Sequence, residues 1–263
     1  MIIKRLLPNK IKTLLFNSKP VIYYKKGKSF LNDAHYLEVQ TKNTQEYLKK
    51  PTRTTIINFL LSIKQGDTTY LEIGVRNPDD NFKHITATSK YSVDPGFEFA
   101  ENPVDFKMTS DVFFQKLSNN EVLSNTTKFD VIFIDGLHLA EQVDKDVTNA
   151  LHYIKEDGFV VLHDCNPPTE WHSREHYRYF NTPAHGAWNG TTWKAFLKWR
   201  SNAVINSCCI DSDWGVGILS KTQPIGKSIK PTNPFYEFNV LDSNRKTYLN
   251  LLDFNTLKSI FQK

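Results

Sequence analysis

The sequence predicts an α/β protein built on a doubly wound, mostly parallel sheet with one antiparallel strand near its C-terminal end. Short and nearly continuous apolar runs occupy residues 68–75, 128–136 and 158–164, and an amphipathic helical pattern lies between the last two. Runs of this kind are typical of strands buried on both faces, and their alternation with helices is typical of parallel sheets. The chain has 263 residues, of which 40% are hydrophobic, which suffices for one large core.

The elements follow in a regular order. The segment PTRTTIINFLLSIK, from Pro51, has a Pro-Thr start and apolar residues at helical spacing, which predicts a helix. TTYLEIGV (68–75), YSVD (91–94) and KFDVIFIDG (128–136) are predicted strands. AEQVDKDVTNALHYI is predicted to be an amphipathic helix, and GFVVLHD (158–164) the next buried strand.

Two β-rich segments then close the sheet. NAVINSCCI and WGVGILSK are predicted to be strands joined by the short Asp211-Ser212-Asp213 turn. Because a short turn joins antiparallel strands, one strand of the pair must run against the rest of the sheet.

We divide the chain into three regions. Residues 1–50 are a basic N-terminal extension, residues 51–225 the core, and residues 226–263 a C-terminal helical tail. Within the core, residues 166–190 fit neither helical nor strand periodicity, are rich in aromatic residues, and follow a central strand directly. Ligands of open α/β sheets bind at the carboxyl ends of strands, so we expect this insertion to cover the substrate. The alternative is a loop pinned by its own aromatic residues.

Basic residues are concentrated at the N-terminus. Residues 1–30 contain eight Lys or Arg and no acid, which leaves 25 basic against 28 acidic residues, a net −3, in the rest of the chain. That balance argues against a uniformly cationic nucleic-acid-binding surface. The extension is either a solvated arm or a contact for an anionic membrane surface or polymer. The eight residues are Lys4, Arg5, Lys10, Lys12, Lys19, Lys25, Lys26 and Lys28.

Cysteine content and apolar run lengths exclude other classes. Cys165, Cys208 and Cys209 form neither a CxxC pair nor a disulfide framework, which indicates a reducing compartment. No apolar run approaches the roughly 18 residues of a bilayer span, and Pro8-Asn9-Lys10 interrupts the N-terminal apolar stretch. We therefore expect a cytoplasmic protein, with peripheral contact to the inner membrane face as the alternative for the extension.

Two strand ends suit an adenosine-containing cofactor. Glu72-Ile73-Gly74 ends the first strand, where a glycine lets a ligand approach the backbone. Asp94 follows 20 residues after Gly74, at the end of the next strand, which is the spacing at which a carboxylate binds ribose hydroxyls. The residues after Gly74 are Val-Arg-Asn-Pro rather than a GxGxxG series, so a cofactor without a diphosphate is favoured.

Taken in order, LEIGV, SVDPG, TSDVFF, FDVIFIDGLH and GFVVLHD resemble the class I S-adenosylmethionine-dependent methyltransferases over roughly residues 55–220. Within that superfamily the chain is most similar to small-molecule O-methyltransferases related to macrocin O-methyltransferase. The resemblance implies a Rossmann-like fold with S-adenosyl-L-methionine as cofactor. It implies that Glu72 and Gly74 line the methionine side, that Asp94 binds the ribose, and that Ser110 and Asp111 meet the adenine.

Two acids at strand ends, Asp135 and Asp164, are expected to face each other at one edge of the sheet. Two carboxylates there could hold Mg²⁺ and present it to a substrate diol. His138, three residues after Asp135, is the predicted general base, which takes the proton of an acceptor hydroxyl so that its oxygen attacks the sulfonium methyl. We assign Asp135 to the catalytic and the cofactor-binding residues. His163 lies inside the last buried strand and is interpreted as a hydrogen-bonded core histidine.

The leading hypothesis is therefore an O-methyltransferase that acts on a hydroxyl of a sugar, a glycan of polysaccharide biosynthesis, or a related small molecule. One alternative is a Rossmann-like NAD(P)-dependent oxidoreductase, although the pyrophosphate cradle is missing. Another is a catalytically silent module of the same fold, docked through its basic extension. Asn166-Pro167-Pro168 resembles a motif of methyltransferases that act on DNA bases, but Thr169 replaces the stacking aromatic, so no nucleic acid is expected. The sequence leaves open whether the protein forms a homo-oligomer.

Overall fold

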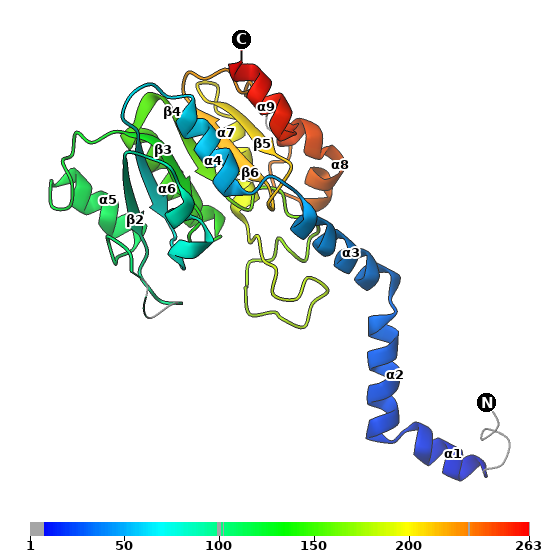
Figure 1. The fold of residues 1–263 in the computed structure, drawn as a ribbon. Helices are drawn as coiled ribbons and strands as arrows, with labels where there is room; N and C mark the ends of the chain where they lie inside the picture. The colour runs from blue at the N-terminus through cyan, green and yellow to red at the C-terminus, as the bar shows by residue number, and fades with distance from the viewer. Residues whose placement is uncertain (1–7, 99–100, 102, 231, 263) are drawn as a thin grey trace.

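The computed structural model describes residues 8–98, 101, 103–230 and 232–262. Within them the chain forms a seven-stranded sheet in the order β2-β1-β3-β4-β6-β5-β7 (Figure 1). The strands are β1 (Thr69–Ile73), β2 (Ser89–Val93), β3 (Phe129–Ile134), β4 (Ile154–Leu162), β5 (Asn206–Ile210), β6 (Val216–Ser220) and β7 (Leu251–Leu252). The helices are α1 (Asn9–Phe16), α2 (Lys19–Leu31), α3 (Ala34–Leu48), α4 (Arg53–Ser62), α5 (Ser110–Ser118), α6 (Ala140–Tyr153), α7 (Thr192–Arg200), α8 (Phe238–Tyr248) and α9 (Phe254–Phe261), with 3₁₀ turns η2 (Pro78–Asp80) and η3 (Phe82–His84).

The predicted mostly parallel α/β sheet is confirmed. β1 pairs in parallel with both β2 and β3, and β3 pairs in parallel with β4. The antiparallel strand is β6, which lies between β4 and β5 and pairs against both. The last strand of the hairpin, β6, is therefore inserted between β4 and β5. As a result, the turn between β5 and β6 lies at the same edge of the sheet as the carboxyl ends of the parallel strands.

The register of the parallel strands aligns the positions that follow them. Ile73 of β1 pairs with Val93 of β2 and with Ile134 of β3, which in turn pairs with Leu162 of β4. Because parallel strands that end in register deliver their next residues to one edge, the segments after all four strands start side by side. This alignment positions the site.

Beyond β2, the described residues add a single bridge to the edge of the sheet. Val93 forms an isolated parallel bridge with Phe106, supported by a hydrogen bond from the Asp94 N–H to the Phe106 carbonyl of 3.2 Å.

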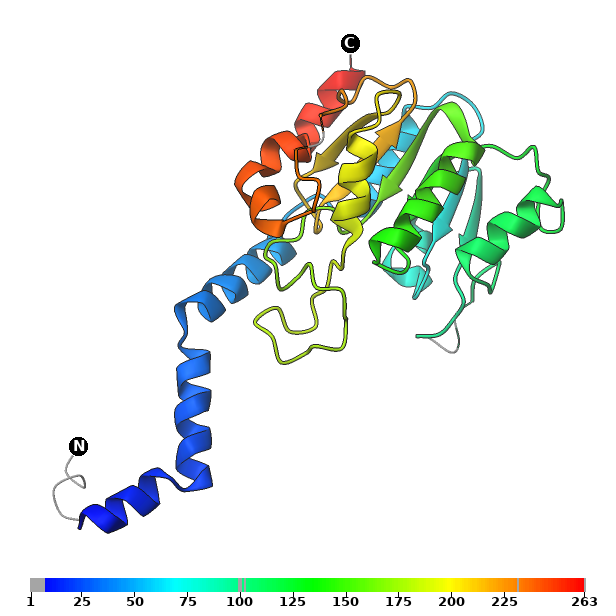
Figure 2. The same ribbon diagram turned by 180° about the vertical axis from the view of Figure 1, so that it is seen from behind.

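Two hydrophobic clusters cover the two faces of the sheet. Helices α5, α6, α7 and α8 contribute buried residues to one cluster, and Figure 2 shows α6 and α7 lying over that face. On the other face, α4 contributes Ile56, Ile57 and Leu60, and α9 contributes Leu257, all fully buried. Strand residues alternate between the clusters, so the sheet is buried on both faces, as its continuous apolar runs predict.

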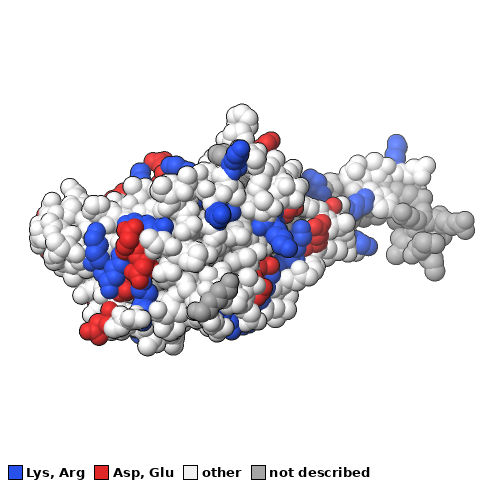
Figure 3. Space-filling model, turned by 90° about the horizontal axis from the view of Figure 1, so that it is seen from above, with Lys and Arg blue, Asp and Glu red and all other residues white. Residues whose placement is uncertain are grey.

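The N-terminal extension consists of helices that leave the body of the protein in both ribbon views (Figures 1 and 2). Only α3 is anchored, through the buried side chains of Tyr36 and Val39, whereas α2 buries none of its residues. Figure 3 shows the extension protruding at one end, with basic and acidic side chains interspersed on the body. Residues 1–7, including Lys4 and Arg5, lie outside the described residues. No helix in the described part of the chain is long and apolar enough to cross a bilayer.

The two remaining regions differ in regularity. Residues 166–190 contain neither helix nor strand and run as a loop below the sheet in Figure 1. The C-terminal tail is mostly helical, but between α8 and α9 it adds the short strand β7, which pairs in parallel with β5. All three cysteines are buried and free.

Candidate active site

A cavity of about 580 Å³ opens at the carboxyl ends of β1, β2, β3 and β4. Its volume lies in the range of small-molecule sites in proteins. The structure brings every predicted site residue to this one cavity. The residues concerned are Glu72, Gly74, Asp94, Ser110, Asp111, Asp135, His138 and Asp164.

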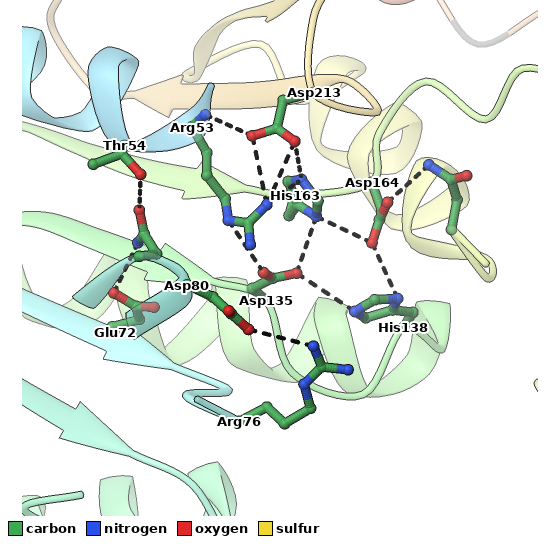
Figure 4. Close-up of polar contacts among 12 residues, drawn as sticks. Arg53, Thr54, Glu72, Arg76, Asp80, Asp135, His138, His163, Asp164 and Asp213 are labelled. Carbon is green, nitrogen blue, oxygen red and sulfur yellow. Dashed lines mark hydrogen bonds and ion pairs between the residues drawn. The ribbon is translucent and has the colours of Figure 1, made fainter. Parts of the chain in front are cut away.

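Two imidazoles bridge the two predicted carboxylates (Figure 4). Nδ1 of His163 lies 3.1 Å from Oδ1 of Asp135 and 3.2 Å from Oδ2 of Asp164. Nδ1 of His138 lies 3.1 Å from Oδ2 of Asp164, and its Nε2 lies 3.5 Å from Oδ1 of Asp135. His163, interpreted from sequence as a core histidine, therefore belongs to the cavity wall.

An arginine and a third carboxylate complete the cluster from other parts of the chain. Arg53, the first residue of α4, places Nε 3.7 Å from Oδ2 of Asp135. Asp213, in the turn between β5 and β6, accepts a 2.6 Å hydrogen bond from the Arg53 N–H and lies 3.4 Å from Nε2 of His163. With both imidazoles protonated, three cationic groups face three carboxylates, so the cluster carries no net charge.

Burial and these neighbours shift the pKa values of the cluster. Burial alone lowers the pKa of His138, but the Asp164 and Asp135 carboxylates outweigh it and raise this pKa to about 9. The same two carboxylates overcome burial at His163 and raise its pKa well above the usual value. Burial opposes ionisation of Asp135, yet His163, His138 and Arg53 hold its pKa well below normal. These shifts favour the protonated form of both histidines at neutral pH.

The end of the insertion holds His138 in place. The indole of Trp188 stacks on the His138 ring, with centroids 5.0 Å apart and planes inclined by 19°. The Thr191 N–H donates a 2.7 Å hydrogen bond to the His138 carbonyl. Between them, Gly190 adopts a φ of +59°, and a Cβ there would lie 2.1 Å from the His138 carbonyl oxygen. Only glycine permits this approach.

The backbone conformation at position 74 and a close contact with the neighbouring strand explain why this residue is glycine. The sequence reading attributes this glycine to close approach of a ligand. In the structure its φ is +91°, and a Cβ would lie 2.4 Å from the carbonyl carbon and oxygen of Asp135. The neighbouring strand end therefore excludes a side chain at Gly74, which also lines the cavity.

Glu72 is a buried acid in the wall of the cavity. Its Oε2 accepts hydrogen bonds from the Tyr70 hydroxyl at 2.6 Å and from Nδ2 of Asn81 at 2.9 Å. Burial raises the pKa of Glu72 to about 7, although both hydrogen bonds oppose the shift. The carboxyl can therefore gain or lose a proton near neutral pH, according to what approaches it.

The remaining predicted cofactor residues lie farther along the sheet edge. Asp94 follows β2 directly, and its Oδ1 accepts a 2.6 Å hydrogen bond from the Gly96 N–H. Ser110 and Asp111 begin α5, and both accept hydrogen bonds from Nε2 of Gln142, at 3.3 and 3.0 Å. Gln142 thus ties the start of α5 to α6 and fixes this end of the cavity.

The insertion is organised around one guanidinium group. Arg174 donates hydrogen bonds to the carbonyls of Trp171, Tyr177, His185 and Ala187, at 2.8 to 3.4 Å. At the base of the loop, the His172 carbonyl accepts hydrogen bonds from the N–H groups of Asn189 and Gly190. The loop is therefore held by the Arg174 side chain and by backbone hydrogen bonds, and it forms part of the rim of the cavity.

The end of the cavity opposite Asp94 is aromatic. Tyr47 from α3 meets Trp214 edge-on, with ring centroids 5.1 Å apart. Tyr177 lies 5.4 Å from Trp188, and all four residues line the cavity. The N-terminal extension, through α3, is therefore part of the cavity wall.

The sequence did not predict that Arg53, Asp213 and Trp214 belong to the site. Arg53 precedes Asp135 by 82 positions, and the turn residues Asp213 and Trp214 have φ values of +46° and +64°, which no periodicity reveals. A single basic residue at the start of an apolar helix was the only available signal for Arg53.

Asn166 has a structural role. Its Nδ2 donates a 3.1 Å hydrogen bond to Asp211, and its Oδ1 accepts one of 2.6 Å from Arg245. Residues 166–168 are not among the described residues that line the cavity.

The acidic edge fits a divalent cation. Donor atoms of Asp135, His138 and Asp164 all lie within 4.8 Å of one another. Two carboxylate oxygens and an imidazole nitrogen form a donor set that hard and borderline divalent cations accept. Because the pKa of His138 is raised to about 9, a cation that binds this nitrogen at neutral pH would have to displace a proton.

A family model described as "Methyltransferase domain" matches residues 70–165. A search of curated proteins found no match.

Solved structures give distant likenesses. An O-methyltransferase from Bacillus cereus in complex with SAH is 16% identical, over 72% of this chain and 90% of that one, with a TM-score of 0.40. A putative O-methyltransferase from Klebsiella pneumoniae is 13% identical, over 75% and 94%, with a TM-score of 0.41. The MycE methyltransferase of the mycinamycin biosynthetic pathway, with Mg and SAH, is 12% identical, over 78% and 59%, with a TM-score of 0.42. With TM-scores below 0.5, these likenesses establish no shared activity or ligand.

Proposed function

With residues 70–165 identified as a methyltransferase domain on a mostly parallel α/β sheet, we propose that the chain is an S-adenosylmethionine-dependent O-methyltransferase. One observation carries the proposal: Glu72, Asp94, Asp135 and His138 line a single cavity at the carboxyl edge of that sheet. Carboxylates and an imidazole gathered there provide a polar site for a cofactor next to a candidate base.

The cofactor would occupy the cavity between β1, β2 and α5, and it supplies an activated methyl group on a sulfonium sulfur. The Asp94 carboxylate has the position and charge to accept hydrogen bonds from two ribose hydroxyls. Ser110 and Asp111 provide acceptors for an adenine amine at the far end of the cavity. Glu72 faces the methionine portion, where ionisation of its carboxyl would balance an ammonium group.

His138 is the proposed general base. Asp164 and Asp135 hold its two ring nitrogens, and stacking on Trp188 fixes the plane of the ring. A base needs an unprotonated nitrogen, so the His138 imidazolium must release its proton before it can accept one from an acceptor hydroxyl. Arg53 and His163 balance the charge of Asp135 during this exchange.

Asp135 and Asp164, with His138 beside them, are the residues that would hold Mg²⁺ if the reaction uses it. A bound cation lowers the pKa of a coordinated hydroxyl and orients a diol. Residues on this chain would then only need to position the acceptor and receive its proton.

The acceptor is proposed to be a sugar, a glycan or a related hydroxylated small molecule, consistent with a cytoplasmic role in polysaccharide biosynthesis. The aromatic end of the cavity supports this class, because Tyr47, Trp188 and Trp214 offer ring faces that suit the apolar side of a sugar ring. His138 lies next to Trp188, so a ring held there would present a hydroxyl to the proposed base.

Ligand-dependent thermal stability tests the proposal against the nicotinamide alternative. Because a ligand that binds the native state raises the melting temperature, S-adenosylhomocysteine should raise it and NAD⁺ should not. Stabilisation by NAD⁺ alone would overturn the methyltransferase assignment. Incubation with labelled S-adenosylmethionine and a panel of methyl glycosides then distinguishes an active enzyme from a silent module.

A further inference from the structure

The surface of α1 and α2 is basic and apolar at once. No acidic residue occurs between residues 8 and 32. On α1, Ile11, Leu14 and Leu15 recur at i, i+3 and i+4, so they share one helix face, and Leu14 is 73% exposed. Large apolar surface left in water on a protruding helix is typical of a contact site. The exposed apolar residues of the two helices are Ile11, Leu14, Leu15, Phe16, Tyr23, Tyr24, Phe30 and Leu31.

The lysines of these helices are not neutralised by the protein. Among the described residues, no acidic side chain forms an ion pair with Lys10, Lys19, Lys26 or Lys28, and Lys25 lies over the ring of Phe16 at 4.5 Å. Lysines attract anionic lipid headgroups, and exposed tyrosines and phenylalanines partition into the headgroup region. Together they suit the surface of an anionic bilayer.

Helix α3 connects this surface to the rim of the cavity. Nε2 of Gln40 lies 3.1 Å from Nε2 of His185, and Oδ1 of Asn43 lies 3.2 Å from Nε2 of His172. Both histidines belong to the insertion, and Figure 1 shows the insertion and the extension on the same side of the sheet. A surface bound by α1 and α2 would therefore lie on the side where the cavity opens.

We propose that α1 and α2 form a docking surface for anionic lipid bilayers. The lysines supply the electrostatic attraction, and the apolar face of α1 enters the headgroup region. This orientation suits an acceptor carried at the same lipid surface, a consequence that rests on the proposed function.

Vesicle co-sedimentation of the full chain tests the proposal. Wild-type protein should pellet with vesicles of phosphatidylcholine and phosphatidylglycerol at about 7:3, but not with phosphatidylcholine alone. Each lysine near an anionic surface contributes about a fivefold factor, so Lys25→Glu, Lys26→Glu and Lys28→Glu together should lower the partition coefficient on the order of 100-fold or more. Lys227→Glu, Lys230→Glu and Lys246→Glu change three exposed lysines of the body by the same charge and should change it less than about twofold.

A second variant pair separates a lipid surface from other occupants. Leu14→Ser with Leu15→Ser should weaken vesicle binding but leave retention on heparin unchanged, because heparin attracts charge alone. Equal weakening by the body lysine variant, equal binding to neutral vesicles, or no effect of the leucine variant would overturn the proposal. So would a dimer in sedimentation equilibrium that the leucine variant dissociates, because a second copy would then cover the face.

The affinity of every variant for S-adenosylhomocysteine is measured by calorimetry as a control. Unchanged affinity shows that the body and its cofactor site are intact. Absence of this binding in the wild type, together with lipid-dependent pelleting, would refute the proposed function and leave the docking surface standing.

Discussion

Nδ1 of His163 lies 3.1 Å from Oδ1 of Asp135, so a buried imidazolium occupies the acidic edge that the sequence assigns to a metal. Arg53 approaches the other oxygen of the same carboxylate. Arg53, His138 and His163 thus balance the charges of Asp135, Asp164 and Asp213. A divalent ion can enter only by replacing positive charge that the protein already supplies.

Cation binding should therefore depend on pH in a defined direction. The pKa of His138 is raised to about 9, so affinity for Mg²⁺ should increase between pH 7 and pH 9 as the competing proton leaves. Calorimetry in two buffers of different ionisation enthalpy measures the protons released per ion bound. Asp164→Asn should abolish the binding. Full methyl transfer in EDTA would show that the reaction needs no cation, and an affinity independent of pH would show that the cation does not displace the His138 proton.

His138→Ala should reduce methyl transfer on the order of 100-fold or more, because a positioned base contributes that much to proton transfer. The measurement is S-adenosylhomocysteine formed under saturating conditions. His152→Ala, an exposed histidine at the end of α6, is the matched control and should retain full activity. Comparable rates for both variants would refute the assignment of the base.

Glu72→Gln should change how stability depends on pH. The pKa of Glu72 is raised from 4.5 to about 7, so between these values the unfolded chain ionises while the folded protein keeps its proton. The free energy of unfolding should therefore fall as pH rises through this window, by up to about 3 kcal/mol. The Gln side chain keeps an oxygen that can accept the hydrogen bonds from Tyr70 and Asn81, but it does not ionise. The substitution should therefore abolish the fall in the free energy of unfolding with rising pH.

Urea unfolding at pH 4.5 and pH 8 measures the difference. Glu141→Gln, at an exposed position of α6, should behave as the wild type. If Glu72→Gln and the wild type show the same dependence on pH, folding does not raise the pKa of the Glu72 carboxyl.

Asp94→Ala should weaken binding of S-adenosylhomocysteine by about 10- to 100-fold, which corresponds to hydrogen bonds to a charged acceptor. Calorimetry gives the dissociation constant. Asp94→Asn keeps an oxygen for the Gly96 N–H and so preserves the turn. If Asp94→Asn binds as tightly as the wild type, Asp94 serves the turn rather than the ribose.

Two truncations should separate the parts of the N-terminal extension. Removal of residues 1–31 should leave the melting temperature and S-adenosylhomocysteine binding unchanged, because α2 buries no residue. Removal of residues 1–48 also takes the buried Tyr36 and Val39 and should lower the melting temperature by roughly 10 °C. A loss of stability in the shorter truncation would show that α1 or α2 packs on the body.

The spacing of apolar residues along the chain allowed the sheet to be predicted from the sequence. The buried strands carry continuous apolar runs, and α6 repeats its apolar residues at helical spacing, so local pattern and tertiary burial agree. The positions of Asp94 and Asp135 followed, because parallel strands end together at one edge. What the pattern did not give was the insertion of β6 between β4 and β5, since pairing partners leave no trace in periodicity.

The missed residues have physical reasons of their own. The sequence reading carries the fourth buried strand to residue 164, but β4 ends at Leu162, so His163 already stands at the edge of the sheet. Asp213 meets the site through a turn with left-handed backbone, and Arg53 through the start of a helix that packs on the opposite face from α6. Such encounters are set by tertiary folding rather than by spacing along the chain.

The guanidinium of Arg174 joins carbonyl groups from both halves of the insertion. A loop fastened in this way loses little conformational entropy when a ligand arrives, because its backbone is already restricted. Selectivity among acceptors then depends on which molecules fit a fixed opening, rather than on which can induce a lid to fold. Evolution could alter that opening one rim residue at a time while the arginine remains.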